Sequence, residues 1–226
     1  KAETQVAETG LAQELFTRQA AVTTAAPTQV DATAESPANW PIVLFDSFDD
    51  NRNDWNLAPH NSEVVVHSRK IENGVYRWEA TARTAFVSNR HPDIKVGSEF
   101  YLAVLAQQVY GPDDGSYGLL FRRSNKDNFY IFRINNRQEH SFQAKIDGKY
   151  GKILDWKYSS AIRPGGKNKI VVVAKGAQFT FFINDHLVVQ AQDMRLEEGN
   201  AGLVIGLQSA GDAATFEFDN FELRVP

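Results

Sequence analysis

Short runs of hydrophobic residues, separated by clusters of turn-forming residues, recur along most of the chain. Residues 117–134 show the pattern best, because two segments rich in aromatic and β-branched residues flank a polar loop at residues 124–128. Such a pair of segments is typical of a β-hairpin. The same pattern predicts strands over residues 42–48, 63–68, 74–80, 99–110, 116–122, 129–134, 141–146, 169–175, 178–183, 187–191, 201–208 and 215–225.

The turns between these runs indicate how the strands are arranged. Asn-Gly, Asp-Gly and Asn-Asp pairs separate them, and such pairs favour tight antiparallel connections. Residues 169–175 and 179–183 have almost no polar face, which indicates strands that are covered on both sides. A turn every ~8–12 residues favours a sandwich over alternating strands and helices. We therefore expect an all-β, two-sheet antiparallel jelly-roll sandwich.

Composition divides the chain near residue 39. Residues 20–41 are rich in Ala, Thr and Pro, and no aromatic residue lies between Phe16 and Trp40. A segment so poor in bulky hydrophobic residues is typical of a linker. We expect an N-terminal arm over residues 1–39 and a single jelly-roll domain over residues 40–226.

The first half of the arm has a helical pattern. Leu11, Leu15 and Phe16 fall on one stripe of a predicted helix. One interpretation is a linker helix that frays. The other is a helix that binds a protein partner or continues an upstream membrane anchor, and we take this stripe as the candidate partner-binding surface.

Charge and composition exclude several classes of function. The formal net charge of the 226 residues is −4; residues 1–39 hold two basic and five acidic residues, so the rest carries about −1. A near-neutral body argues against nucleic-acid binding, which needs a clustered basic surface. The absence of cysteine excludes disulfides, thiolate zinc sites and cysteine nucleophiles. No apolar run approaches the ~18–20 residues of a membrane span, and because the chain starts with Lys we expect that an upstream segment was removed.

A series of short motifs in a fixed order adds a resemblance to a known family. The motifs are Phe45-Asp-Ser-Phe48, Asn73-Gly-Val-Tyr-Arg-Trp78, Tyr117-Gly-Leu-Leu-Phe-Arg122, Asp127-Asn-Phe-Tyr-Ile-Phe132, Ser159-Ser-Ala-Ile162, Gly165-Gly-Lys-Asn168 and Phe218-Asp-Asn-Phe221. Together they resemble the bacterial laminin-G-like, concanavalin A-like jelly-roll domains, the superfamily that includes 3-keto-disaccharide hydrolase-type domains. The resemblance covers about residues 40–225. It implies a two-sheet jelly roll, often outside the cell, that binds carbohydrate or protein or serves as a spacer.

One acidic motif is a candidate for catalysis. Glu217, Asp219 and Glu222 have a spacing that resembles the active strand of laminarinase-type β-glucanases. A bulge at residues 219–220 would place all three side chains on one face, as a retaining mechanism with paired carboxylates requires. The motif lies on the last predicted strand, however, and the same residues are also typical of an ordinary closing strand without a catalytic role. We therefore predict no catalytic residues and a non-enzymatic domain, with a glycoside or keto-glycoside hydrolase as the minority alternative.

The sequence gives only weak indications of metal or cofactor sites. Asp46 and Asp49 could meet Asp219 if the first and last strands pair, and carboxylate oxygens are ligands for Ca²⁺. The same aspartates also read as a solvated turn. The histidines lack metal-ligand spacing, and no phosphate-binding glycine loop is present. We expect no cofactor, with a structural calcium as the alternative.

Aromatic residues are the candidates for sugar binding. Sugar-binding sandwiches place a flat ring against the pyranose and hydrogen-bonding groups beside it. The candidate side chains are Trp78, Tyr117, Arg122, Tyr130 and Trp156, with Arg133 and Asn135 as further polar groups. Because both faces of residues 129–134 are partly apolar, most of these rings must lie in the core.

These observations favour a non-catalytic domain outside the cytoplasm, at the cell surface or in the periplasm. We expect it to act as a structural or protein-interaction subunit, attached through its N-terminal arm to a membrane or a larger assembly. A lectin-like carbohydrate-binding domain is the first alternative.

Overall fold

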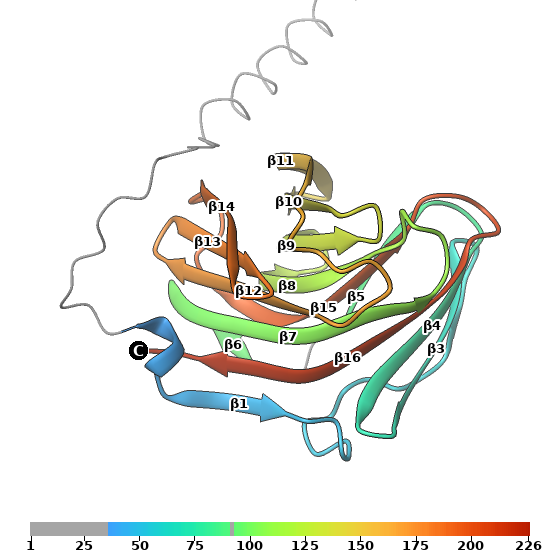
Figure 1. Cartoon of the computed structure of the whole chain (residues 1–226), viewed down its shortest axis with the longest axis horizontal. Coiled ribbons are helices and arrows are strands. Elements are labelled where there is room, and N and C mark those ends of the chain that lie inside the picture. The colour runs from blue at the N-terminus through green and yellow to red at the C-terminus, as the bar shows by residue number, and fades with distance from the viewer. Residues whose placement is uncertain (1–35, 91–92) are drawn as a thin grey trace, which may run out of the picture.

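The computed structural model describes residues 36–90 and 93–226 (Figure 1). The predicted stripe of Leu11, Leu15 and Phe16 lies outside the described residues, as does most of the predicted arm. Within them, no helix has the length and hydropathy of a membrane span.

The described part of the chain forms sixteen strands and one short 3-10 helix. The elements are η1 (Pro37–Asn39), β1 (Ile42–Asp46), β2 (His60–Asn61), β3 (Val65–Glu72), β4 (Val75–Ala82), β5 (Phe86–Arg90), β6 (Lys95–Val96), β7 (Glu99–Tyr110), β8 (Ser116–Asn125), β9 (Asn128–Asn135), β10 (Glu139–Ile146), β11 (Lys149–Tyr158), β12 (Asn168–Lys175), β13 (Gln178–Ile183), β14 (His186–Gln192), β15 (Gly199–Leu207) and β16 (Ala213–Arg224).

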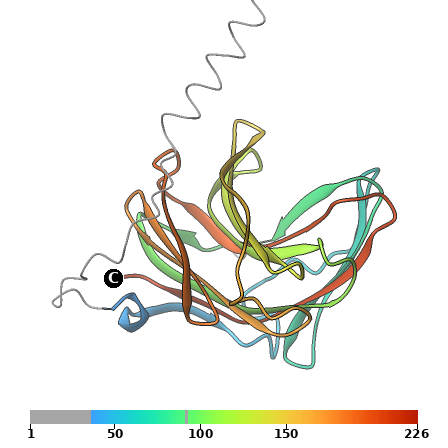
Figure 2. The ribbon, with the colours of Figure 1, turned by 45° about the horizontal axis from the view of Figure 1, so that its top comes forward.

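The strands form two antiparallel sheets. Sheet A has nine strands in the order β14-β13-β12-β7-β16-β4-β3-β2, with β1 also pairing β16. Sheet B has seven strands in the order β11-β10-β9-β8-β15-β5, with β6 also pairing β15. The long strands β7 and β16 run along the lower side of the molecule in Figure 1, and β9 to β11 lie above them. Figure 2 shows the hairpins of β9 to β11 standing above this lower layer. The predicted two-sheet jelly roll is confirmed.

The main core lies between the two sheets because the strands of both alternate in polarity. Leu102 and Val104 of β7 point inward and are fully buried. Phe132 of β9 meets Phe181 of β13, with ring centroids 4.3 Å apart and planes 18° apart. Rings contributed by both layers therefore hold the sandwich together, as expected for sheets packed about 10 Å apart.

The outer face of sheet B is also enclosed. Leu120, Ile131 and Val204 point away from the main core, yet each is 0% exposed, and they form a second hydrophobic cluster with Phe129. Tyr150 of β11 packs edge-on against Phe129, with centroids 6.0 Å apart. On a flat sheet, the outward side chains of the central strands would be exposed. Because they are buried here, the strands at the edge of sheet B must curve over its outer face, which is therefore hollow.

A histidine in the main core predicts how stability depends on pH. His140 is 3% exposed and packs against Phe132. Burial, with a smaller contribution from Lys157, lowers the pKa of His140 from 6.5 to about 4. As the pH falls, His140 of the unfolded chain therefore takes up a proton at a higher pH than His140 of the folded protein. The stability that depends on neutral His140 is complete above about pH 6.5 and is lost as the pH falls toward 4.

We expect the free energy of unfolding to fall by about 2–3 kcal/mol between pH 7 and pH 4.5 because of His140 alone. Urea denaturation at both pH values, for the native protein and for His140→Gln, measures this difference. The variant should lose that part of the pH dependence, and an unchanged pH dependence would contradict the assignment.

Candidate functional site

A polar pocket opens at one end of the hollow on sheet B. Its volume is about 180 Å³, and we call it the Trp156 pocket. The lining side chains come from strand ends and turns, and they are Asp114, Asn135, Arg137, Glu139, Trp156 and Gln208. The turns between β7 and β8 and between β9 and β10, together with the end of β15, therefore meet around one indole ring.

Trp156 reaches this position because β11 curls. The pairing of β10 with β11 shifts register on both sides of Phe142, and such irregularities bend and twist a strand. The ring of Trp156 is half-buried and lies 5.4 Å from the guanidinium carbon of Arg133. The ring also lines the pocket, so it can offer a flat apolar surface to a ligand.

Arg133 forms the support beneath this ring. Its side chain donates hydrogen bonds to Oγ of Ser116 (3.0 Å) and Oε1 of Gln143 (2.9 Å). Gly206 allows this close approach, because a Cβ there would lie 2.8 Å from Nη1 of Arg133. Burial lowers the pKa of Arg133 to about 10, which leaves it charged at neutral pH. No ion pair of Arg133 occurs among the described residues, and the guanidinium group makes a cation–π contact with the indole ring in addition to its two hydrogen bonds.

The remaining polar side chains of the pocket form hydrogen bonds with one another. Nδ2 of Asn135 donates to Oε2 of Glu139 (2.9 Å), and the backbone N–H of Glu139 donates back to Oδ1 of Asn135 (3.0 Å). Nη2 of Arg137 donates to Oδ2 of Asp114 (2.9 Å). Carboxylates and guanidinium groups have further acceptor and donor capacity. The pocket therefore presents fixed donors and acceptors beside a flat ring, which is the chemistry that a sugar requires.

Three predicted sugar-binding rings lie elsewhere. Trp78, Tyr117 and Tyr130 are all 0% exposed, because each occupies an inward position of its strand. Burial raises the pKa of Tyr117 to about 12, and its hydroxyl accepts a hydrogen bond from Asn168. The hydroxyl of Tyr130 donates to Asp193 at 2.5 Å. The prediction that these rings bind sugar is wrong, and they are core residues; Trp156, the fourth predicted ring, lines a pocket.

Arg122 is also a core residue. It has a positive φ of 49°, and its side chain is 1% exposed. The guanidinium group donates to three backbone carbonyl oxygens, those of Ser98 (2.8 Å), Gly176 (2.6 Å) and Leu196 (2.9 Å). Carbonyl groups of the chain thus bind both terminal nitrogens of this buried arginine, and its predicted role in ligand binding is wrong.

The acidic motif of the last strand lies on the opposite sheet from the Trp156 pocket. The predicted bulge is confirmed, since the pairing of β16 with β7 shifts between Asp219 and Glu222. Glu217 forms an ion pair with Arg77 (2.6 Å), and Nζ of Lys167 lies 4.0 Å from Asp219. Glu222 pairs with Arg224. Each carboxylate therefore has a basic side chain within 4.0 Å.

Only two of the three predicted calcium ligands lie near each other, because Asp49 acts electrostatically on Asp219 while Asp46 is buried. The first and last strands pair as expected, with Asp46 opposite Phe221. Asp46 points inward, however, and accepts hydrogen bonds from Asn53 and Trp55, whereas Asp219 lies on the outward face. Across the part of the chain that the structure describes, no group of three or more His, Asp or Glu side chains could hold a metal ion. The set of Asp46, Asp49 and Asp219 is therefore wrong as a metal site.

The fold is shared with known carbohydrate-active proteins. The carbohydrate-binding module CBM66 from Bacillus subtilis superimposes with a TM-score of 0.58 at 20% identity, covering 76% of this chain and 95% of that chain. The β-glucanase of Bacillus licheniformis gives 0.60 at 9% identity, covering 81% and 98%. The catalytic domain of an endo-1,3-β-glucanase (laminarinase) from Thermotoga petrophila RKU-1 gives 0.57 at 10% identity, covering 83% and 98%. At these identities the similarity shows the fold alone, a two-sheet jelly roll.

Family membership rests on the sequence. A comparison with curated proteins gave no match. A family profile described as "3-keto-alpha-glucoside-1,2-lyase-like domain" matches residues 40–224, which is most of the chain. The chain therefore belongs to the 3-keto-alpha-glucoside-1,2-lyase-like domain family.

Proposed function

We propose that this domain binds carbohydrate in the Trp156 pocket. The observation that supports the proposal is the half-buried indole of Trp156, supported by Arg133 and surrounded by donors and acceptors from three connections of the fold. Indole rings bind the apolar face of a sugar, and the polar groups around them select its hydroxyls. The similarity of the fold to a carbohydrate-binding module is consistent with this role.

The other functions expected from the sequence have less support in the described residues. The protein-interaction role depended on residues 1–39, which lie mainly outside the described residues. Attachment to a membrane and a location outside the cytoplasm stay predictions. Cleavage of the bound sugar is the second candidate: two carboxylates, Asp114 and Glu139, line the same pocket, where Arg137 binds the first and Asn135 binds the second.

The test of the proposal replaces Trp156 with alanine in the full chain. A glycan array identifies ligands of the native protein, and calorimetry then measures their affinity for both proteins. We expect Trp156→Ala to weaken binding at least tenfold, because a sugar–indole contact contributes about 1.4 kcal/mol or more. Analysis of products in the same mixtures determines whether the sugar is cleaved.

Phe45→Ala is the matched control, since Phe45 is an aromatic residue 49% exposed on β1 of the other sheet. It should bind like the native protein, and both variants should keep the native thermal transition. An equal loss of binding in Phe45→Ala, or an array without a single ligand, would contradict the proposed function.

A further inference from the structure

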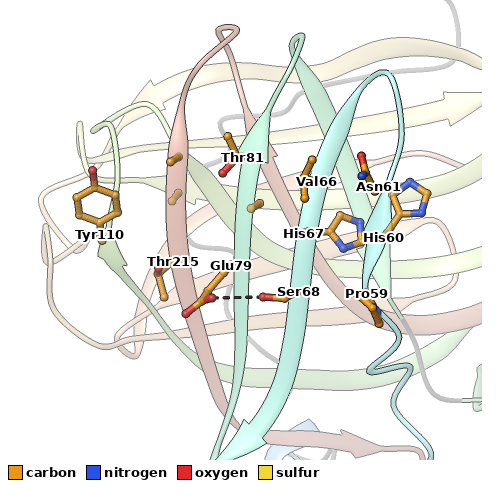
Figure 3. Close-up of a pocket in the computed structure, with 13 residues that line it drawn as sticks. Pro59, His60, Asn61, Val66, His67, Ser68, Glu79, Thr81, Tyr110 and Thr215 are labelled. Atoms are coloured by element: carbon orange, nitrogen blue, oxygen red, sulfur yellow. Dashed lines mark hydrogen bonds between the residues drawn. The ribbon is translucent and has the colours of Figure 1, made fainter.

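Whereas the Trp156 pocket lies on sheet B, a larger cavity lies on sheet A. Its volume is about 500 Å³, within the usual range of ligand pockets. It crosses the outer face of sheet A over β2, β3, β4 and β16 and ends at Tyr110 of β7 (Figure 3). We call it the cross-strand groove. None of the residues predicted from the sequence to bind a ligand lines it.

Strand register builds two rows of side chains along this groove. Tyr110 pairs with Thr215, Thr215 with Glu79, and Glu79 with Ser68, so these four residues form the first row. Ala213, Thr81, Val66 and Asn61 form the second row by the same successive pairing. Three strand spacings of about 4.8 Å give each row a length of roughly 14 Å. The groove is therefore elongated and runs perpendicular to the strands.

The two ends of the groove carry flat rings, and the side chains between the ends are not aromatic. Tyr110 is 67% exposed at one end. At the other end the ring of His60 stacks on that of His67, with centroids 4.9 Å apart and planes 24° apart. In Figure 3, Thr81, Val66, Ser68 and Glu79 lie between these ends. The small side chain of Ala213 leaves the floor open beside Tyr110.

The polar groups of the groove favour a ligand that donates hydrogen bonds and carries no negative charge. Glu79 accepts from Nε of Arg77 (3.0 Å) and from Oγ of Ser68 (3.3 Å). The hydrogen bond from Arg77 is the main reason that the pKa of Glu79 is lowered, so this carboxylate is ionised. No lysine or arginine is among the lining residues. Phosphate, sulfate or uronate groups would meet repulsion from Glu79, whereas sugar hydroxyls would find an acceptor and several hydroxyl and amide groups.

The direction of the groove argues against an extended peptide. A peptide that adds to a sheet pairs its backbone with a free strand edge. The groove instead runs across the strands, and β4 at its centre is paired with β3 on one side and with β16 on the other. A ligand here is recognised by side chains alone. We propose that the cross-strand groove is a second carbohydrate site, which binds a neutral, linear oligosaccharide across the strands and is independent of the Trp156 pocket.

The test uses the isotope-labelled full chain and NMR titration with neutral hexasaccharides of glucose (β-1,3- and β-1,4-linked), xylose and mannose. At least one of them should shift the amide signals of Asn61, Thr81 and Thr215. Tyr110→Ala should weaken this binding about tenfold, and Thr81→Val, which keeps the shape and removes the hydroxyl, should weaken it several-fold. Tyr158→Ala is the matched control, because Tyr158 is also 67% exposed but lies on sheet B.

The same titration in Trp156→Ala separates the two sites. Shifts in the groove that persist in Trp156→Ala support a second site even if the Trp156 pocket binds no sugar. The proposal is overturned if the groove signals stay unchanged with all the hexasaccharides, if their shifts disappear in Trp156→Ala, or if Tyr158→Ala weakens binding as much as Tyr110→Ala. Groove shifts caused only by a lysine- and arginine-rich hexapeptide would also overturn it, in favour of a basic peptide.

Discussion

Asp193→Ala is expected to lower the free energy of unfolding by about 3–5 kcal/mol, because it removes the buried carboxylate that binds both a nearly buried cation and a buried hydroxyl. The side chain of Asp193 is 0% exposed and pairs with Arg195, whose side chain is 10% exposed. Asp193 also accepts a hydrogen bond from the hydroxyl of Tyr130 at 2.5 Å. The same hydroxyl accepts from the backbone N–H of Leu196 at 3.0 Å. One carboxylate thus ties the segment after β14 to a core ring of sheet B.

Chemical denaturation measures this loss, with Asp185→Ala as the matched control. Asp185 pairs with Lys169 at 3.1 Å but its side chain is 79% exposed, so its removal should cost less than about 1 kcal/mol. Asp193→Asn keeps one acceptor oxygen and should fall between the two. Equal stabilities of Asp193→Ala and Asp185→Ala would show that water reaches the Asp193 cluster.

The Asp193 cluster also shows why sequence reasoning misplaced the sugar-binding rings. Alternation along residues 129–134 predicts which residues share a face, but it cannot say which face meets the core. Tyr130 and Arg133 lie on opposite faces of β9, and the structure turns Tyr130 toward sheet A. Its hydroxyl is satisfied by Asp193, which follows β14 and has no recognisable link to β9 in the sequence.

The fold itself was largely predictable, because its strands are long and strongly patterned. The expected strands at 99–110, 129–134 and 169–175 agree closely with β7, β9 and β12. Sequence analysis missed β11, where charged residues interrupt the hydrophobic pattern of residues 149–158. It also missed β5, and it missed β2 and β6, which have only two residues each. Such strands depend on their partners rather than on local propensity.

The Trp156 pocket was predictable only in part. Trp156, Arg133 and Asn135 were candidates by residue type, and the structure brings them to one face. The other lining residues, among them Asp114 and Gln208, lie in turns or at strand ends. A polar residue at such a position usually indicates only that the position is exposed to solvent. The cross-strand groove gave no sequence signal, because its rows arise from the register of strands that are distant in the chain, such as β4 and β16.

Asp46→Ala is expected to lower the free energy of unfolding by about 2–4 kcal/mol, because it leaves three donors without an acceptor. Asp46 is 4% exposed and accepts from the backbone N–H of Phe48 (2.8 Å), Nδ2 of Asn53 (2.7 Å) and Nε1 of Trp55 (2.8 Å). Phe48 has a positive φ of 54°, so the turn that it occupies depends on this hydrogen bond. The rings of Phe48 and Trp55 then pack together, with centroids 5.4 Å apart.

The same experiment decides between this hydrogen-bonding role and a calcium ligand. Asp49→Ala is the control, since Asp49 is exposed and accepts a hydrogen bond from the hydroxyl of Ser47, and it should change the stability by less than about 0.5 kcal/mol. Thermal unfolding of the native protein should give the same Tm with added Ca²⁺ and with EDTA, because the oxygens of Asp46 are already occupied by protein donors. A Tm that rises several degrees with Ca²⁺ in the native protein but not in Asp46→Ala would restore the metal interpretation.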